Sequence, residues 1–282
     1  MSSIVPLTPV DYLVIGHLSR DLTPQGQRLG GTAAFSSLTA RALGLQAGVV
    51  TCWGNELPLN GLEGVQMVVV PVDRSTTFEN VSSEEGRVQY LHHVAPRLSF
   101  DLVPKIWQHT PIMHIGPIAR EIDPFLGPGL SPVLLGLTPQ GWLRTWDSNG
   151  RVLSCGWEES DRALKEAGAT VLSIEDLDGD EEIIEAMALA SRVLAVTEGV
   201  GGVRLYWNGD MRYFRAPVMK EKDATGAGDI FATAFFCRLH VTRDPWEAAR
   251  FATQLASLSV TRCGLESIPT ADEVQQCLVE VL

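Results

Sequence analysis

Two closely spaced glycines in front of an apolar run constrain this chain more than any other feature. Residues 223–229 read Asp-Ala-Thr-Gly-Ala-Gly-Asp, and mostly apolar residues follow. Gly226 and Gly228 permit close backbone approach or a positive φ. A helix that begins beside them directs free N–H groups and its positive dipole end into the turn. The pattern predicts an anion site with Asp229 at its edge, where a carboxylate can serve as a general base beside a phosphate. The alternative is an ordinary glycine-rich turn that caps a core helix.

Length and charge exclude several classes of function. The chain has 282 residues, enough to bury a sizeable core. Its net charge of -12 argues against nucleic acid or an anionic membrane as the main partner. No run of about 18 apolar residues occurs, so we expect no membrane span. The five cysteines are scattered without a C-x-x-C pair, which predicts reduced core thiols and a cytoplasmic location.

Short apolar runs alternate with helix-like segments along most of the chain. The expected strands are 12–16, 47–53, 65–72, 112–115, 133–137, 171–174 and 192–197. The expected helices are 32–43, 161–167, 180–190, 229–239 and a last one that starts at Pro245 with Asp244 as its N-cap. This alternation predicts a mostly parallel sheet covered by helices. Ligands of such sheets lie at the carboxyl ends of the strands, and the turn before Asp229 should face that crevice.

The stretch 75–95 has a different pattern. Segments 76–81 and 87–92 alternate polar and apolar residues around a turn at 82–86. The alternation predicts paired strands with one face open to solvent or to a ligand. We expect a hairpin that covers a site, with lid strands within 17–29 and 74–97, inside a single domain that spans 1–282.

The turn at 223–229 resembles the D-[TP]-x-G-A-G-D signature of the PfkB (ribokinase-like) sugar and nucleoside kinases at its defining positions. The resemblance extends over nearly the whole chain. It implies a three-layer α/β/α fold with a mostly parallel central sheet and a small β lid. It also implies ATP and Mg²⁺ as cofactors and a hydroxyl of a small polyol, sugar or nucleoside as the acceptor. Family members often dimerise through the lid, so a homodimer through segment 88–91 is a further expectation.

The same resemblance implies roles for individual residues. Asp229 becomes the general base, and the backbone N–H groups of Gly226, Ala227 and Gly228 form an anion hole. The residues implied in acceptor binding are Asp21, Gly30, Gly31, Thr32, Phe35 and Gln140. A carboxylate such as Asp21 suits a polyol because it accepts charge-assisted hydrogen bonds. The alternatives are a solvated loop acid at Asp21 and a plain turn at Gly30 and Gly31.

Residues 196–203 resemble the V-T-x-G-x-x-G nucleotide segment of the family. The residues implied in nucleotide binding are Thr197, Gly199, Gly202, Thr225, Thr253 and Gly264. Thr253 stands where the family usually has Asn on the adenine side, within a helix that can equally be a core helix. The strand-like run 203–207 after the glycines argues against a dinucleotide-binding fold and thus against an oxidoreductase. The chain also lacks a P-loop motif.

Two departures from the family pattern concern the metal and the fold. Residues 173–176 read Ser-Ile-Glu-Asp where the family has N-x-x-E. Asp176 keeps a hard oxygen ligand that can reach Mg²⁺ through water, and the alternative for this segment is helix N-capping. Between Gly54 and Gln66 the family commonly has a full helix, and here the segment is too short and too turn-rich for one.

A third departure concerns the acceptor. Phe35 stands where many family members carry Asn, and segments 30–35, 76–79 and 140–147 resemble the inositol kinases of the family. These similarities favour myo-inositol or a close cyclic polyol. Lys and Arg are sparse near the proposed acceptor residues, which argues against a phosphorylated acceptor. A kinase for a simple sugar or nucleoside, or a binding or regulatory protein without turnover, remains the competing interpretation.

Overall fold

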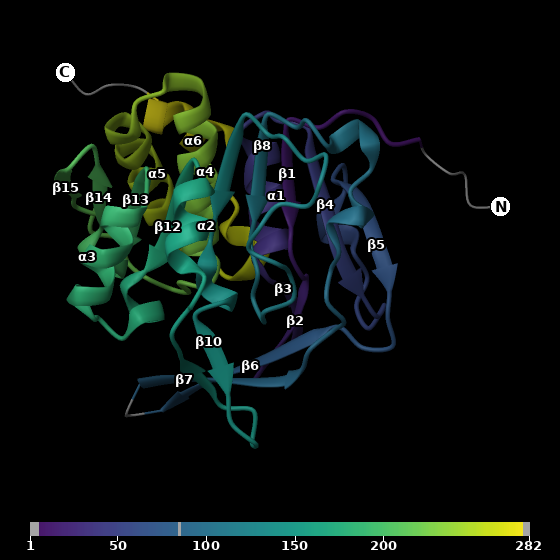
Figure 1. Ribbon diagram of the computed structural model, residues 1–282. Helices are drawn as coiled ribbons and strands as arrows, with labels where there is room; N and C mark the ends of the chain where they lie inside the picture. The colour runs from purple at the N-terminus through teal and green to yellow at the C-terminus, as the bar shows by residue number, and fades with distance from the viewer. Residues whose placement is uncertain (1–5, 84–85, 279–282) are drawn as a thin grey trace.

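A nine-stranded sheet forms the centre of the molecule. The computed structural model describes residues 6–83 and 86–278 (Figure 1). The strands are β1 (Tyr12–Ile15), β4 (Ala47–Trp53), β5 (Gln66–Pro71), β8 (Ile112–Ile115), β9 (Leu134–Leu137), β12 (Ala169–Ser173), β13 (Val193–Thr197), β14 (Val203–Trp207) and β15 (Asp210–Phe214). They lie in the order β15-β14-β13-β12-β9-β8-β1-β4-β5. Neighbouring strands from β13 to β5 are parallel, and β14 and β15 form an antiparallel edge.

Helices cover both faces of this sheet. The helices are α1 (Thr32–Ala42), α2 (Ser160–Glu166), α3 (Glu181–Ala190), α4 (Ala227–Thr242), α5 (Pro245–Ser259) and α6 (Ala271–Leu278). Figure 1 shows α2 and α3 on one side of the sheet and the other helices on the opposite side. Tyr12 and Val14 of β1 pack into the core beneath α1, α4 and α5, while Leu13 and Ile15 pack into the core on the α2 and α3 side. A central strand buried on both faces is typical of a parallel sheet, and the expected α/β/α architecture is confirmed.

Local signals account for several element ends. Asp244 caps α5 by accepting hydrogen bonds from the N–H groups of Trp246 and Glu247, as its sequence predicts. Helix α4 begins at Ala227, two residues before the expected start. Segment 54–66 contains only a single 3₁₀ turn, Asn60–Leu62, in agreement with the expected absence of a full helix. Within residues 6–83 and 86–278, no helix combines the length and apolar character needed to cross a membrane.

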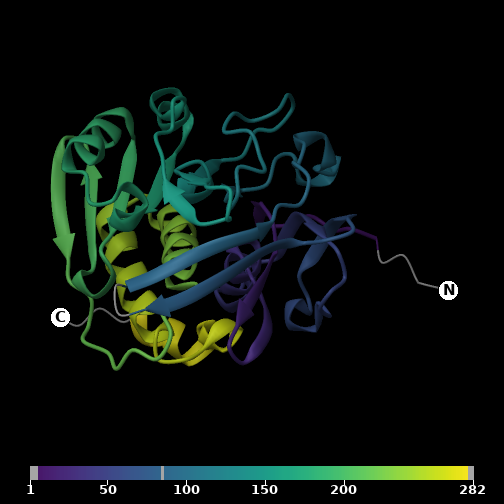
Figure 2. The same cartoon turned by 90° about the horizontal axis from the view of Figure 1, so that it is seen from below.

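A second, small sheet lies beyond the carboxyl ends of the central strands. It consists of β2 (Ser19–Thr23), β3 (Gly26–Gly30), β6 (Thr76–Ser83) and β7 (Gly86–His93), in the order β3-β2-β6-β7. Seen from below, the β6–β7 hairpin crosses the underside of the molecule (Figure 2). Phe78 and Leu91 of this hairpin pack on Ile118 and Ala119 of the core. Residues 84–85, in the expected turn, lie outside the described residues.

A hairpin that the sequence did not predict extends the small sheet. Strands β10 (Arg144–Trp146) and β11 (Val152–Ser154) pair with each other, and the N–H of Leu91 donates to the carbonyl of Gly150 at 2.7 Å. A further bridge joins Tyr90 and Arg151. Strands of three residues carry too little alternation to be recognised from a sequence. The hairpin ties the end of the β6–β7 strands to the segment that carries Arg144.

Candidate active site

A cavity of about 1200 Å³ opens between the carboxyl ends of the central strands and the small sheet. Its wall brings together most of the residues that the sequence singled out. These are Asp21, Gly31, Thr32, Phe35, Gln140, Asp176, Thr197, Gly199, Gly202, Thr225, Gly226, Ala227, Gly228, Asp229 and Thr253. Gly30 and Gly264 are not on the wall. Segments more than 200 residues apart in the chain, such as those of Asp21 and Asp229, therefore share one space.

The glycine turn begins helix α4. Gly226 is the N-cap and has a left-handed backbone with φ 83°. A Cβ at Gly226 would overlap the ring of Phe35, so both conformation and packing require glycine there. Gly228 differs, because it has no positive φ and a Cβ there would meet nothing within 4 Å. The N-terminus of α4 thus presents open space to the cavity at Gly228, where an anion could approach the free N–H groups.

Asp229 is the third residue of α4 and lies against the start of α1. The hydroxyl of Thr32, the first residue of α1, donates to Asp229 Oδ1 at 2.7 Å. The surrounding protein shields the carboxylate from water and raises the pKa of Asp229 to about 6. The Thr32 hydrogen bond and the charge of Arg144 oppose this rise, and Asp176 adds to it. A carboxylate with such a pKa is ionised at neutral pH and is still a useful base.

Asp21 and the glycine pair form one packed unit. Asp21 lies on β2, and the hydroxyl of Ser19 donates to its Oδ1 at 2.7 Å. A Cβ at Gly30 would overlap the Asp21 carboxylate, and one at Gly31 would lie 2.7 Å from the carbonyl oxygen of His17. Gly30 therefore makes room for Asp21, and Gly31, with φ 87°, is the N-cap of α1. The pair positions Asp21 and Thr32 at the same end of the cavity.

Phe35 and Gln140 are on the wall but are engaged with neighbours. The ring of Phe35 is only 2% exposed and packs beneath Gly226. It supports the anion turn and offers little surface to an acceptor. The amide of Gln140 donates to Asp176 Oδ1 at 3.4 Å.

Asp176 closes a capping box with Ser173. The hydroxyl of Ser173 accepts from the N–H of Glu175, and Asp176 Oδ2 accepts from the N–H of Ser173 at 3.0 Å. Burial raises the pKa of Asp176, and Arg144, whose Nη2 lies 3.9 Å from Oδ1, opposes the rise. The serine at 173 is thus explained as the cap of the turn Ile174–Leu177. Across the described parts of the chain, no three His, Cys, Asp or Glu side chains gather in a way that could hold a metal by themselves.

The residues assigned to the nucleotide lie on one side of the cavity. Thr197 ends β13, and the short turn Gly199–Gly201 follows it. Between them, Glu198 accepts a 2.7 Å hydrogen bond from the hydroxyl of Tyr213 and forms an ion pair with Arg204. This clamp fixes the turn from the side of β14 and β15.

The remaining nucleotide-side residues serve mainly to connect elements. Asp223 Oδ1 accepts from the N–H of Thr225 at 2.9 Å, and its Oδ2 accepts from the N–H of Gly264 at 3.3 Å. Gly264 therefore supports the anion turn from outside the cavity. Thr253 donates its hydroxyl to the carbonyl of Ala249 within α5, which leaves mainly its methyl group for a ligand.

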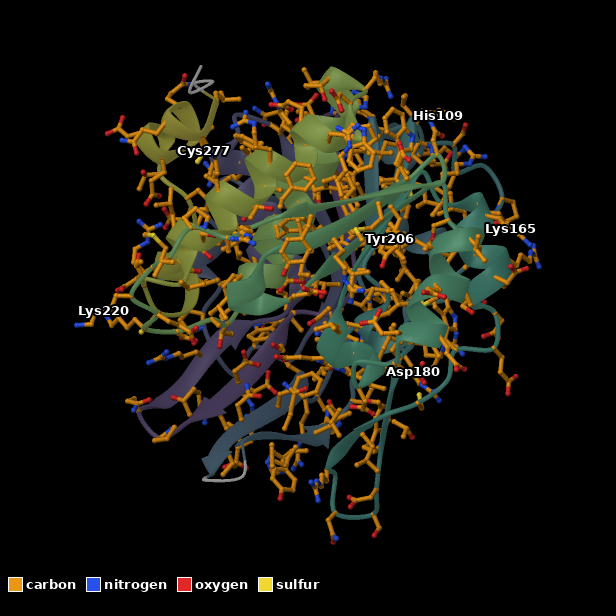
Figure 3. The ribbon with its side chains drawn as sticks, turned by 90° about the vertical axis from the view of Figure 1, so that its left-hand side faces the viewer. His109, Lys165, Asp180, Tyr206, Lys220 and Cys277 are labelled. Atoms are coloured by element: carbon orange, nitrogen blue, oxygen red, sulfur yellow. The ribbon has the colours of Figure 1, made fainter. Side chains whose placement is uncertain are left out.

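Several wall residues escaped the sequence analysis. They include Asn80, Gln89, Arg144, Arg151 and the segment 216–219. Figure 3 shows the connection that contains Lys220 on the outside of the molecule, between β15 and α4. Arg144 and Arg151 are the basic side chains on the described cavity wall. Arg144 lies within segment 140–147, which resembles the inositol kinases of the family. That resemblance is the sequence signal that could have identified Arg144 as a site residue.

The family model described as pfkB family carbohydrate kinase matches residues 162–271, which contain the glycine turn and α4. Over these residues the chain is similar to the pfkB family. With kinases among its relatives, it is an enzyme of the sugar, polyol or nucleoside kinase class. The anion turn and Asp229 lie together in its cavity, as that chemistry requires.

Two curated kinases and one solved structure resemble this chain. The cytidine kinase of Thermococcus kodakarensis is 25% identical and covers 92% of this chain and 99% of its own. The ribokinase of Bacillus subtilis is 39% identical over 97 residues, 34% of this chain and 33% of that protein. A pyrophosphate-dependent kinase in the ribokinase family, complexed with a pyrophosphate analog and myo-inositol, superposes with a TM-score of 0.78 at 20% identity, covering 94% of this chain and 99% of that one. The last similarity establishes the fold.

Proposed function

We propose that this kinase transfers a phosphoryl group from ATP to a hydroxyl of a small neutral cyclic polyol, with myo-inositol as the first candidate. The carrying observation is that Asp229 lies at the open N-terminus of α4 in the same cavity as Asp21. In this proposal an acceptor bound at Asp21 turns one hydroxyl toward Asp229, and the phosphoryl group enters at Gly228.

Asp229 takes the proton of the attacking hydroxyl. With a pKa of about 6, Asp229 is ionised at neutral pH and is a stronger base than an ordinary aspartate. Thr32 holds one carboxylate oxygen at 2.7 Å and so orients the other toward the acceptor. At the start of α4 the N–H of Ala227 donates to the carbonyl of Ala224 at 3.2 Å. The N–H of Gly228, beside open space, is the donor proposed to stabilise charge on the phosphoryl oxygens.

The donor is inferred to be a nucleoside triphosphate. The cavity wall includes the apolar side chains of Val200, Val218, Ala256 and Val260, and the two valines at 200 and 218 are almost fully exposed. Exposed apolar surface that lines a cavity favours a flat apolar ligand such as a purine. The similar solved structure is described as pyrophosphate-dependent, and pyrophosphate would leave these side chains uncovered. Initial rates with ATP, GTP, CTP and pyrophosphate test this inference, and a preference for pyrophosphate would reject it.

Magnesium fits this site as an ion carried by the nucleotide. Glu175 is an exposed carboxylate on the wall, and hard oxygen atoms of this kind suit Mg²⁺. Asp176 is a poorer direct ligand because its oxygens already face Ser173, Gln140 and Arg144. A bound Mg²⁺ would neutralise phosphate charge, with Glu175 and, through water, Asp176 as the residues to hold it.

The acceptor is inferred from the side chains around Asp21. Asn80 and Gln89 are cross-strand neighbours on β6 and β7, and the amide of Gln89 donates to Asn80 Oδ1 at 3.0 Å. The pair leaves the N–H₂ of Asn80 and the carbonyl of Gln89 for other partners. Neutral donors and acceptors of this kind match the hydroxyls of an uncharged polyol.

A nucleoside acceptor is the second candidate, because the similarity to a cytidine kinase extends over nearly the whole chain. The test is kcat/KM for myo-inositol, ribose, fructose 6-phosphate, adenosine and cytidine with ATP as the donor. A clear preference for cytidine, adenosine or ribose would reject the polyol and keep the kinase. Binding of ATP and acceptor without turnover would instead favour a binding or regulatory protein.

Dimerisation through the β6–β7 hairpin stays a prediction. Val81 on this hairpin is exposed, and a second copy of the chain could cover such an apolar side chain. Sedimentation equilibrium of the chain, compared with a Val81→Lys variant, measures it.

A further inference from the structure

One arginine lies beside a buried carboxylate on the cavity wall. Arg144 is the first residue of β10, its side chain is 19% exposed, and its Nη2 lies 3.9 Å from Asp176 Oδ1. Burial raises the pKa of Asp176 and of Asp229, and the positive charge of Arg144 opposes both rises. The β10–β11 hairpin that carries it is held against β7 by the backbone bond between Leu91 and Gly150. Arg144 therefore belongs to a built part of the site and lines the same cavity as the proposed base.

The charges on the cavity wall make this position unusual. Seven carboxylates line the described cavity: Asp21, Glu175, Asp176, Asp178, Glu198, Glu221 and Asp229. Among the described residues of the wall, the basic side chains are Arg144 and Arg151, and no Lys is present. Arg151 is exposed and bridges to Tyr90 at the edge of the small sheet. A donor with three or four negative charges thus meets a mostly acidic wall, and Arg144 is the wall cation whose charge reaches Asp229.

We propose that Arg144 is a catalytic residue that contacts the transferring phosphoryl group. This inference rests on the proposed function. The acceptor oxygen forms a bond to the γ-phosphorus while its proton passes to Asp229. The bond from the γ-phosphorus to the bridging oxygen breaks, and ADP leaves with that electron pair. The Arg144 guanidinium stays protonated throughout and donates N–H bonds to oxygens of the phosphoryl group, whose charge it neutralises.

Asp176 has hydrogen-bond donors in addition to its ion pair with Arg144, so Arg144 is not required to stay with it when a phosphoryl group binds. Asp176 also accepts from the N–H of Ser173 at 3.0 Å and from Gln140 at 3.4 Å. Arg144 can therefore turn toward a phosphoryl group without leaving the buried carboxylate unpaired. A lysine would keep the charge but could not offer the planar, two-pronged set of donors that suits phosphate oxygens.

The test compares Arg144→Gln and Arg144→Lys with the wild-type chain. We expect kcat to fall by about 10²–10³-fold in Arg144→Gln, with KM for the acceptor within a few-fold of wild type. Arg144→Lys should recover part of the loss. Arg162→Gln on α2 is the matched control, because its guanidinium pairs with Glu166 at the surface and should leave kcat unchanged.

A second readout does not require turnover. Calorimetry should show that Arg144→Gln weakens binding of ADP with aluminium fluoride, a mimic of the transferring group, by at least ten-fold. Binding of a non-hydrolysable ATP analogue should change by less than three-fold. A purely structural role for Arg144 would weaken both complexes alike and would overturn the proposal.

Three further results would also overturn it: kcat of Arg144→Gln within three-fold of wild type, a loss confined to acceptor KM, or full activity in Arg144→Lys. If Arg144→Gln does not fold, Arg144→Lys keeps the charge opposite Asp176, and its kcat must be at least ten-fold below wild type. Absence of turnover in the wild-type chain with every donor and acceptor would reject the proposed function instead. The aluminium fluoride comparison would still decide the role of Arg144.

Discussion

Thr32 and Asp229 join the N-termini of two helices through a single hydrogen bond. The Thr32 hydroxyl, at the first position of α1, lies 2.7 Å from Oδ1 of Asp229, at the third position of α4. Both helices direct free N–H groups toward this point. The bond therefore fixes the proposed base relative to the acceptor end, where Gly31 and Asp21 lie, and relative to the anion turn.

Replacement of Asp229 separates catalysis from folding. Asp229→Asn keeps an oxygen that can accept from Thr32 and removes a charge that the surrounding protein disfavours. We expect kcat to fall by about 10²–10⁴-fold and the melting temperature at pH 7 to stay the same or rise. Turnover within a few-fold of wild type would remove Asp229 from the role of base.

The pH dependence of activity should follow Asp229. Its pKa is raised from 3.8 to about 6, so protonation switches the base off, and kcat/KM should fall as the pH drops through about 6. Stability has the opposite sign. A raised pKa means that the folded state binds the proton more tightly, so this contribution is full below about pH 4 and is lost as the pH rises through about 6. Rate profiles and melting curves between pH 4.5 and 8 of wild type and Asp229→Asn measure both, and an acidic limb that persists in the residual activity of the variant would contradict the assignment.

The two glycines of the anion turn should respond differently to alanine. Gly226→Ala forces a side chain into a left-handed backbone and onto the ring of Phe35, and we expect a loss of about 1–3 kcal/mol in the free energy of unfolding. Gly228→Ala should fold normally, because its Cβ enters open space, but should weaken ATP binding. Denaturant unfolding and calorimetry separate the two. Equal stability of both variants would be evidence against this distinction.

A buried histidine should fix the small sheet to the core. His17 follows β1, and its ring lies 2.7 Å from Thr76 Oγ1 and 3.0 Å from the carbonyl oxygen of Pro96, at the two ends of the β6–β7 hairpin. Burial lowers the pKa of His17 and favours the neutral ring, in which Nε2–H donates to Pro96 and Nδ1 accepts from Thr76. We expect His17→Leu to raise KM for the acceptor by at least ten-fold and to change KM for ATP less. A matched change in both KM values would show that the hairpin does not act on the acceptor alone.

Much of the fold followed from local sequence signals. The apolar runs of β1 and β4, the cap at Asp244 and the glycine turn before α4 each depend on neighbouring residues, and short-range conformational preferences identify them. Asp229 and the Gly226–Gly228 turn were recognisable for the same reason, because a helix N-terminus and its glycines are contiguous in the chain.

Tertiary structure alone decided how those pieces meet. The β10–β11 hairpin was missed because its strands span three residues each, and this hairpin places Arg144 on the same cavity wall as Asp229. Phe35 packs beneath Gly226 and Asp176 closes a capping box with Ser173, and the identity of a single residue does not determine such contacts. Contacts between residues far apart in the chain depend on how the sheets and helices pack together. A local sequence pattern does not specify which distant residues then lie next to each other. The sequence by itself determined that this chain builds an anion turn beside a carboxylate. The packing of the two sheets decided which charges surround that carboxylate.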